Sequence, residues 1–574
     1  MQKELHIKGS QKILSIIHNF SATEKVIFGL FAIIAILAAL IMAWKVNRAF
    51  LLTTPAYGSS FSEGIIGLPR SVNPVLAFTD IDKDISSLIY SGLMKYENGK
   101  LVPDMAEKYT VSPDGLTYTF ILSDDLRFHD GTALTADDVE FTIQKVQDSA
   151  LKSPRRVDWA SVTVKKISEK EIQFILKQPY APFLSNTTIG IIPKHIWKNV
   201  DVDQFIFSQY NIEPIGSGLY KIDAIERDGA GIPRYYVLIP FSHYHGKKAY
   251  ISKIFFHFYP NEKDAIEAYK AGTIENLGGI SPEEASRLDT ALEKSVILHT
   301  PISRIFGVFF NQNNSPVLAN REVRKALNMA VDREKIIREV LKGYGVSVDG
   351  PLPTMGSSTN SKKIIADKDE AKSILTKAGW LINQEGIREK KISGGSQTLE
   401  FSISTTDAPD LKQAAEIIKT DWEDLGASVT IKVFEFGDLS QNIIKTRKYD
   451  ALLFGEVIGK DLDIYAFWHS SQRNSPGLNV SMYVNSKVDN LLEEARAESD
   501  ETKRDDIYKS FQKTIENDIP AVFLYSPEYI YVISDRIKGY DFKYIVNPSD
   551  RLHGIDKWHI NIDYVWKIFV SDKK

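Results

Sequence analysis

The sequence contains no cysteine in 574 residues. This absence excludes disulfide bonds, a cysteine nucleophile, thiolate metal sites and iron–sulfur clusters. The chain also lacks an excess of either charge, because 70 Lys and Arg residues stand against 74 Asp and Glu residues, which gives a net charge of −4. That balance gives no general reason to expect nucleic-acid binding. We therefore expect no nucleic-acid partner.

The motifs of common catalytic machineries are missing as well. The Gly-rich stretch PIGSGLY is not followed by the Gly-Lys-Ser/Thr of a phosphate-binding loop, and there is no Ser-His-Asp or His-Glu-x-x-His arrangement. The acid pairs Asp124/Asp125 and Asp137/Asp138 are the candidates for a hydrolase with paired carboxylates. Adjacent side chains rarely aim at one substrate, so we expect no catalytic residues and no enzyme.

A metal site is not expected either. His243 and His245 could share one side of a strand, but other ligand types are missing from their neighbourhood in the sequence. His195 lies in a Pro-rich turn, where a single histidine is usually structural or exposed. The sequence therefore predicts no metal ligands and no cofactor.

The composition is that of a folded protein, with 43% hydrophobic and 25% charged residues. A chain of 574 residues is too long for one ordinary hydrophobic core, so we expect two or three domains.

One long uncharged run, Val26–Trp44, is 19 residues long and suffices to cross a bilayer. Ser21-Ala-Thr-Glu24, directly before it, has the pattern of a helix capping box. A cleavable signal peptide is the alternative, but Trp44-Lys45-Val46-Asn47-Arg48 offers no good small-x-small cleavage site. We favour an uncleaved transmembrane signal anchor at residues 26–44.

The charges on either side of this run predict its orientation. Four lysines precede it and only Lys45 and Arg48 follow closely, so the positive-inside bias puts residues 1–25 in the cytoplasm. The predicted protein is a single-pass protein of the cell membrane, with an extracytoplasmic C-terminal domain. Residues 45–62 have the composition of a short tether.

A strand, a turn and a helix are predicted over residues 116–146. Tyr118, Phe120 and Leu122 alternate with polar residues as in a half-buried strand. Asp130-Gly131 is typical of a tight turn, and Thr135 is a candidate N-cap for the helix that follows.

Within this region, FHDGTALTADDVEF (residues 128–141) resembles the FxDGxPLTAxDVxF block of the extracellular solute-binding proteins of family 5. These are the dipeptide-, oligopeptide- and nickel-binding receptors of ABC importers. Further stretches resemble this family between about residues 64 and 540, namely 100–109, 178–183, 191–195, 214–220, 320–330, 479–489 and 519–525. Many relatives are lipid-anchored through a lipobox cysteine, which this chain lacks, so its membrane attachment must be by peptide.

The resemblance implies an α/β fold like that of periplasmic binding proteins (type II, cluster C), with two main lobes and an extra lobe, behind an N-terminal transmembrane helix. The boundaries that it implies are 63–93, 196–303 and 526–574 for lobe I, 94–195 for lobe II and 304–525 for lobe III.

Lobe III has its own alternation of strands and helices. The pattern predicts a strand at 399–403, a helix at 411–425, a strand at 429–433, a helix at 438–446 and a strand at 449–454. A strand–helix–strand crossover of this length is right-handed. In open α/β sheets, ligands bind beyond the ends of the strands.

The segment after the last of these strands, Phe454–Trp468, is where the resemblance places a substrate site. Peptide-binding relatives commonly have an Asp there that pairs with the peptide's α-ammonium, because a desolvated ammonium needs a carboxylate partner. Glu456 is the only acid near the matching position, with Asp461 and Asp463 as alternates. Capping of the predicted helix 464–469 is the competing explanation for both aspartates.

Two further candidates complete the predicted substrate-binding set. Trp468 ends the same segment, and Asn311 ends a strand that resembles the family's crossing into lobe III.

The expected function is that of a membrane-anchored substrate-binding protein of an ABC importer, which captures peptides by hinged closure of two lobes and delivers them to the permease subunits. Alternatively, the same fold binds a non-peptide solute such as a metal chelate or an oligosaccharide.

Overall fold

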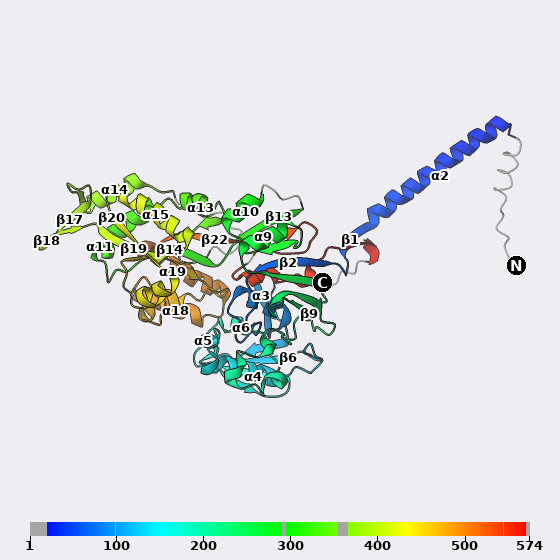
Figure 1. Ribbon diagram of the computed structural model, residues 1–574, viewed down its shortest axis with the longest axis horizontal. Coiled ribbons are helices and arrows are strands. Elements are labelled where there is room, and N and C mark those ends of the chain that lie inside the picture. Colours follow the sequence, from blue (N-terminus) through cyan, green and yellow to red (C-terminus); the bar gives the residue numbers. More distant parts are fainter. Residues whose placement is uncertain (1–19, 98, 290–293, 354–364, 544, 570–574) are drawn as a thin grey trace. The chain divides into compact units, whose positions relative to one another are not determined.

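A computed structural model describes residues 20–569 of the chain, except 98, 290–293, 354–364 and 544 (Figure 1). Contacts divide the chain into a small unit, 1–56 with 561–574, and a large unit, 57–560. Most of the predicted cytoplasmic segment, 1–25, lies outside the described residues.

The small unit consists of one long helix and a two-stranded sheet. Helix α2, Ala22–Phe50, begins with the predicted capping box, in which Ser21 and Glu24 bond each other's backbone N–H. Strand β1, Leu51–Pro55, directly follows the helix and pairs antiparallel with β23, Ile562–Trp566. The stretch predicted as a tether, 45–62, therefore contains the end of a helix and a strand.

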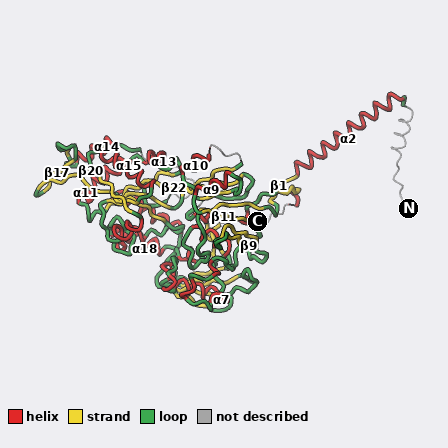
Figure 2. Tube along the Cα trace, in the orientation of Figure 1, coloured by secondary structure: helices red, strands yellow, loops and turns green. Residues whose placement is uncertain are grey.

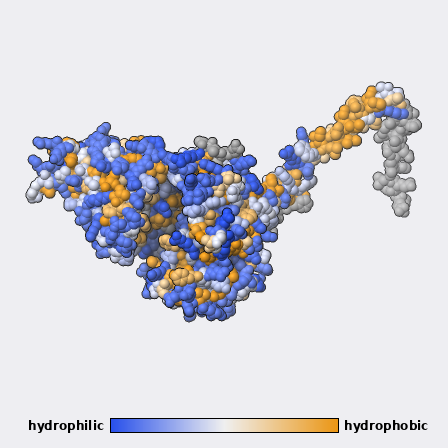
Figure 3. All heavy atoms as spheres, viewed as in Figure 1, coloured by the Kyte–Doolittle hydropathy of each residue, from blue (hydrophilic) through white to orange (hydrophobic). Residues whose placement is uncertain are grey.

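Helix α2 is long and apolar enough to cross a membrane, and it is the one helix among the described residues that meets this criterion by length and composition. None of its side chains is buried. Figure 3 shows hydrophobic residues along its length. A helix that is apolar on every side and packs against no protein core is typical of a membrane span.

The described residues of the large unit form one twelve-stranded sheet and three smaller sheets (Figure 2). The path through the large sheet runs β20-β19-β21-β14-β22-β12-β2-β11-β10-β9, and β13 and β15 also pair with β22. The bounds of these strands are β2 Ser60–Ile66, β9 Tyr220–Arg227, β10 Pro233–Pro240, β11 Lys253–Tyr259, β12 Asn276–Gly278, β13 Ser295–Pro301, β14 Arg304–Phe310, β15 Gly345–Ser347, β19 Glu400–Thr406, β20 Ser428–Phe434, β21 Ala451–Val457 and β22 Ala521–Ser534.

The large sheet has two halves, one from β20 to β14 and the other from β12 to β9, and strand β22 belongs to both. Its first residues pair with β14 and its last residues pair with β13 and β12. Where it passes from one half to the other, Ile302 N–H donates to the Pro527 carbonyl (3.0 Å) and the Ser526 hydroxyl donates to the Ile302 carbonyl (2.6 Å). The two halves of the sheet are thus joined by two neighbouring backbone crossings, at Ile302–Ser303 and Ser526–Pro527.

The half containing β14 confirms the strand–helix–strand unit predicted at 399–433. Strands β19 and β20 pair in parallel, and α15, Pro409–Glu423, connects them. Odd residues of β21 face one hydrophobic core and even residues face a second one on the other side of the sheet. The first core is covered by α12 Arg321–Ala330, α14 Lys368–Lys377 and α15, and the second by α18 Ser486–Ala497 and α19 Glu501–Asp518.

Strand β21 differs from its prediction in a way that matters for the site. It continues to Val457 instead of ending at Phe454, because its pairing with β14 runs without interruption from Ala451 to Val457. Glu456, predicted to lie in the segment after the strand, therefore lies within it.

The predicted strand–turn–helix is found in a four-stranded sheet of order β5-β6-β8-β7. Strand β6, Thr117–Leu122, buries alternate residues, and α4, Ala136–Gln147, begins at the predicted N-cap Thr135. The Asp138 carboxylate accepts a bond from Thr135 N–H at 2.9 Å. The remaining strands of this sheet are β5 Ala106–Val111, β7 Thr163–Lys166 and β8 Glu171–Ile175.

A buried cluster of charges ties the 3-10 helix Pro548–Leu552 to the half of the large sheet that contains β2. The Arg551 guanidinium donates to Glu63 of β2 at 2.9 Å (Nε–Oε1) and to Asp84 of α3, Asp80–Ile89, at 2.7 Å (Nη2–Oδ2). Tyr531 of β22 donates its hydroxyl to the other oxygen of Glu63 at 2.9 Å. Burial raises the pKa of Asp84 to about 6, although the charge of Arg551 opposes this. We call Glu63, Asp84, Arg551 and Tyr531 the Arg551 cluster.

Removal of the cation from this cluster is expected to destabilise the fold strongly. The R551M variant leaves Glu63 and Asp84 buried without a cation, a change that costs about 3–5 kcal/mol in other proteins. The triple variant R551M/E63Q/D84N removes all three charges and should recover much of the loss. Melting temperatures of the wild type, R551M and the triple variant test this expectation. The control is K509M, which removes the cation of the exposed Lys509–Asp506 pair. Equal melting temperatures for R551M and K509M would refute the structural role of the cluster.

Candidate functional site

A cavity of about 830 Å³ lies in the large unit. Its walls come from segments that are far apart in the sequence, namely 87–104, 155–188, 244–247, 459–463 and 546–556. This volume is in the range of small-molecule and peptide sites in other proteins. A cavity built by several segments from both halves of the chain is suited to close around a ligand when those segments move together.

The cavity is acidic. Seven carboxylate side chains line it against four Lys and Arg side chains. The carboxylates are Glu97, Asp104, Asp158, Asp461, Asp463, Asp550 and Asp556, and the cations are Lys95, Arg155, Lys247 and Lys460. Such an excess of negative charge favours a ligand with a cationic group.

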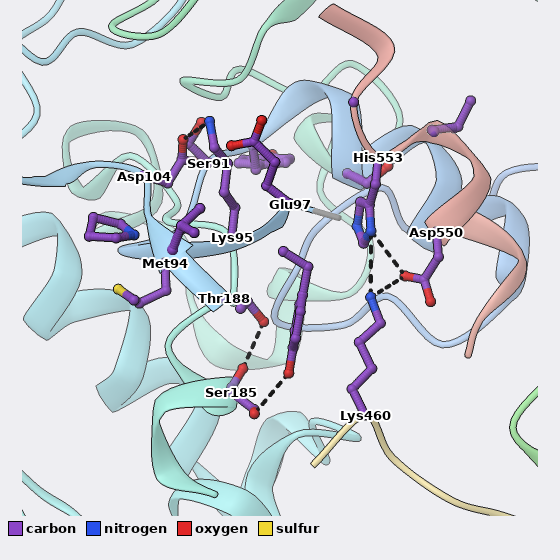
Figure 4. Close-up of a pocket in the computed structure, with 18 of the residues that line it drawn as sticks. Ser91, Met94, Lys95, Glu97, Asp104, Ser185, Thr188, Lys460, Asp550 and His553 are labelled. Carbon is purple, nitrogen blue, oxygen red and sulfur yellow. Dashed lines mark hydrogen bonds and ion pairs between the residues drawn. The ribbon is translucent and has the colours of Figure 1, made fainter. Parts of the chain in front are cut away.

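Lys460 joins the 459–463 loop to the 546–556 segment across the cavity (Figure 4). Its ammonium lies 2.8 Å from the Asp550 carboxylate and 4.2 Å from the centroid of the Tyr96 ring. Burial lowers the pKa of Lys460, although Asp550 opposes this. Asp550 also accepts the backbone N–H groups of Val546 and Asn547, at 2.8 and 2.9 Å. Lys460 and Asp550 therefore satisfy each other and fix the two segments.

Asp463 is occupied in the same way. Arg496 of α18 donates to it through Nη2 at 2.7 Å and Nε at 2.9 Å, and the Tyr180 hydroxyl donates to it at 2.9 Å. Arg496 also lies 3.8 Å from the centroid of the Tyr465 ring, and its carbonyl accepts the N–H of Ala181 at 2.8 Å. These bonds join the 459–463 loop and α18 to the 180–183 segment, of which Tyr180 also lines the cavity.

Asp461 has no such partner. No ion pair to it is found among the described residues, and its one hydrogen bond is a long one from the Asp463 N–H, at 3.4 Å. Burial, together with the charges of Asp463 and Asp158, raises the pKa of Asp461 to about 6. A carboxylate in this state gains much from a positive group that enters the cavity, because the group satisfies it and lowers its pKa.

A second polar cluster lies on another wall of the cavity. Asp104 accepts bonds from His245 at 3.1 Å and from Lys95 at 3.0 Å. The hydrogen bond from His245 and the charge of Lys95 hold the pKa of Asp104 below its usual range, although burial opposes them. His245 thus serves as a partner for a buried aspartate.

The structure brings two of the five predicted site residues to the cavity. Asp461 and Asp463 line it, and Asp463 also accepts the N–H of Tyr465 at 3.3 Å, at the start of the short helix α17, Tyr465–Trp468. The capping explanation therefore applies to Asp463 in part.

The other three predicted residues are buried elsewhere. Asn311 bonds the carbonyl of Arg447 at 2.9 Å and holds the turn after β14. Trp468 packs among Phe309, Tyr483, Phe511 and Phe523. Glu456 points into the same core from β21. None of these three residues lines the cavity.

Glu456 is a carboxyl group without a hydrogen-bond partner among the described residues. Burial raises its pKa to about 8, and the indole N–H of Trp468 lies near enough to oppose this without forming a hydrogen bond. At neutral pH the group is therefore mostly protonated, and it is not available as a charged partner for a ligand.

Sequence reasoning missed Lys460, Asp550 and the Asp104–His245 pair. Lys460 lies within the segment, Phe454–Trp468, where the resemblance places a substrate site. Asp550 and His553 lie 90 and 93 residues from Lys460. No local pattern in the sequence connects positions so far apart.

The architecture matches that of solved periplasmic solute-binding proteins. A structure of oligopeptide-binding AppA from Bacillus subtilis in complex with a nonapeptide superposes with a TM-score of 0.66 and 26% identity, and covers 88% of this chain and 100% of that one. NikZ from Campylobacter jejuni in complex with Ni(L-His) superposes with a TM-score of 0.67 and 25% identity, and covers 87% and 99%.

Sequence comparison gives the family. The chain matches the bacterial extracellular solute-binding proteins, family 5 (Middle), over residues 100–477. It is 27% identical to B. subtilis AppA over 518 residues, 88% of this chain and 92% of AppA, and 26% identical to the dipeptide-binding protein of Escherichia coli over 517 residues, 85% and 92%. The chain belongs to this family, whose members are solute-binding receptors.

The buried carboxyl group of Glu456 leads to a prediction about how the stability of the protein depends on pH. Its pKa is higher in the folded chain than in an unfolded one, so the stability that it contributes is present below about pH 4.5 and is lost as the pH rises toward 8. The loss is at most about 1.4 kcal/mol per pH unit. The E456Q variant cannot lose a proton, so its melting temperature should fall less than that of the wild type between pH 5 and about pH 9. Parallel curves for the two proteins would contradict the assignment.

Proposed function

We propose that the protein is the membrane-anchored, extracytoplasmic substrate-binding protein of an ABC importer, and that it captures peptides and delivers them to the permease subunits. Membership of the family supports a receptor and not an enzyme. The names of AppA and of the E. coli relative support peptides as the ligand class. The acidic cavity with an unpaired carboxylate at Asp461 is the observation that carries the proposal.

Asp461 is the proposed partner of the ligand's ammonium group. It is the carboxylate of the 459–463 loop that has no Lys or Arg partner in the described part of the chain, whereas Asp463 is paired with Arg496. We assign Asp463 the task of holding the loop in place. Glu456, Trp468 and Asn311 support the site from the core behind it, through the packing of β21 and β14.

Ligand capture is proposed to occur by hinged closure. The lobes retain the boundaries 63–93, 196–303 and 526–574 for lobe I, 94–195 for lobe II and 304–525 for lobe III, the extra lobe of a cluster C arrangement. The crossings at Ile302–Ser303 and Ser526–Pro527 are the proposed hinge, because two short backbone links can bend while the cores on either side stay intact.

Membrane attachment is proposed to occur through residues 26–44 as an uncleaved signal anchor, with residues 1–25 in the cytoplasm and the large unit outside. The apolar length of α2 and the excess of lysines before it support this orientation.

A non-peptide solute is the second candidate for the ligand. The match to NikZ, whose structure holds a nickel–histidine chelate, favours it over an oligosaccharide. The nickel ion brings positive charge to such a chelate, so it would use the same acidic wall.

The D461N variant tests the proposed ligand contact. Binding of a pool of short peptides, measured by calorimetry at pH 7, should weaken about 10- to 100-fold, because a hydrogen bond to a charged group contributes about 1.5–3 kcal/mol. Wild-type affinity should also fall about tenfold per pH unit below about pH 6, as Asp461 takes up a proton. D461N should lack this pH dependence.

Two controls sharpen the experiment. An N-acetylated peptide pool has no α-ammonium and should bind the wild type as weakly as free peptides bind D461N. The D556N variant changes another carboxylate of the cavity wall and should bind nearly as the wild type does. If D461N binds free peptides as tightly as the wild type does, the assignment of Asp461 is overturned. If the wild type binds Ni(L-His) but no peptides, the non-peptide solute replaces peptides as the proposed ligand.

A further inference from the structure

The two-stranded sheet of the small unit has one aromatic face. In an antiparallel pair, residues directly opposite each other point to the same side. The register places Leu51 opposite Trp566, Thr53 opposite Tyr564 and Pro55 opposite Ile562 on this side. The other side holds the pairs Leu52–Val565 and Thr54–Asp563. The first side, which we call the aromatic face, consists of Leu51, Thr53, Pro55, Ile562, Tyr564 and Trp566.

Large side chains of the aromatic face are exposed. Tyr564 is 65% exposed, Ile562 45% and Trp566 43%, and Ile568, just beyond the strand, is 76% exposed. A sheet of only two strands also has no core of its own and is marginal in water. A surface of this kind needs an apolar or interfacial environment.

The sheet is continuous with the helix that crosses the membrane in the proposed function. Strand β1 begins at Leu51, one residue after the end of α2 at Phe50. Six helical residues separate Trp44, the end of the uncharged run, from Leu51, a rise of about 9 Å. The headgroup region on each side of a bilayer is about 5–8 Å thick. The sheet therefore starts at the outer edge of the headgroups.

Side chains around this point are those found where membrane meets water. The Phe50 ring stacks on Trp566, with 6.2 Å between the centroids. The Arg48 guanidinium lies 5.2 Å from the centroid of the Trp44 ring. Lys45 and Lys567 add positive charge. Trp and Tyr concentrate at bilayer interfaces because their rings are apolar and their N–H and O–H groups stay hydrated, and basic residues meet the lipid phosphates.

We propose that the aromatic face of the β1–β23 sheet lies on the extracytoplasmic interface of the bilayer that α2 crosses, with Tyr564 and Trp566 at the level of the headgroups. This inference rests on the proposed membrane anchor and goes beyond it. The Ala56 N–H donates to the Asn561 carbonyl at 3.0 Å, so the two strands leave the sheet side by side. The chain entering the large unit at Tyr57 and the chain leaving it at Ile560 are thus both held at the membrane surface, and the receptor is tied to the membrane by two links instead of one.

The absence of cysteine makes a direct test possible. The variants T53C, T54C and A38C of the full-length chain are each labelled with an environment-sensitive fluorophore and reconstituted into phosphatidylcholine nanodiscs. Thr53 and Thr54 are neighbours of the same residue type on opposite faces of β1, so they form a matched pair. Quenching is then measured with lipids that carry a nitroxide either near the headgroup or near the middle of the acyl chain.

The expected result is that headgroup nitroxide quenches the T53C label at least threefold more than the T54C label. The A38C label, within α2, should be quenched most by the mid-chain nitroxide. The double change Y564S/W566S in the T53C chain should abolish the difference from T54C and leave quenching at A38C unchanged.

The two proposals fail in different ways. Equal quenching at T53C and T54C, with strong mid-chain quenching at A38C, would overturn the interfacial sheet and leave the anchor intact. No mid-chain quenching at A38C would overturn the anchor itself, and the interfacial sheet with it. A T53C label that stays protected from headgroup nitroxide in both the parent and the Y564S/W566S chains would likewise refute the proposal.

Discussion

The structure of the large unit depends on one buried cation. Arg551 holds Glu63 of a central strand and Asp84 of α3 at once, away from water. A buried ion cluster adds little to stability compared with apolar packing, but it fixes geometry, because each charge tolerates few other positions. It sets the position of the 3-10 helix Pro548–Leu552, and Asp550, the residue beside Arg551, is thereby presented to the cavity. The candidate site is thus positioned by this buried ion cluster behind it.

The fixed position of Asp550 also constrains a loop in the other half of the chain. Lys460 reaches Asp550 from the 459–463 loop, and Asp463 of that loop is clamped by Arg496 and Tyr180. Asp461, between them, has no cation beside it among the residues that the structure describes. A loop that is fixed on both sides of one unpaired carboxylate is preorganised for a positive group, because little further ordering is needed when the ligand arrives. The same contacts join segments of both halves of the chain, so they link the proposed closure of the lobes to the state of the site.

Much of this architecture could be predicted from the sequence, because it rests on local patterns. The capping box at Ser21, the N-cap at Thr135 and the strand predicted at 399–403 all depend on residues close together in the sequence, and the structure confirms them. The site could be predicted only in part. Glu456 is the only acid near the position that the resemblance gives to the ammonium partner, but the pairing of β21 with β14 extends the strand past it and turns it into the core. The ion pair between Lys460 and Asp550 depends on the fold as a whole, so no local pattern in the sequence predicts it.

The central claim is that this receptor closes around a ligand by bending between two halves. The distance between spin labels at K165C and K432C, exposed positions on the proposed lobes II and III in a chain without native cysteines, tests it most directly. Pulsed electron–electron double resonance should give a shorter and narrower distance distribution after addition of peptides that raise the melting temperature of the protein. An unchanged distribution in the presence of such bound peptides would contradict the account.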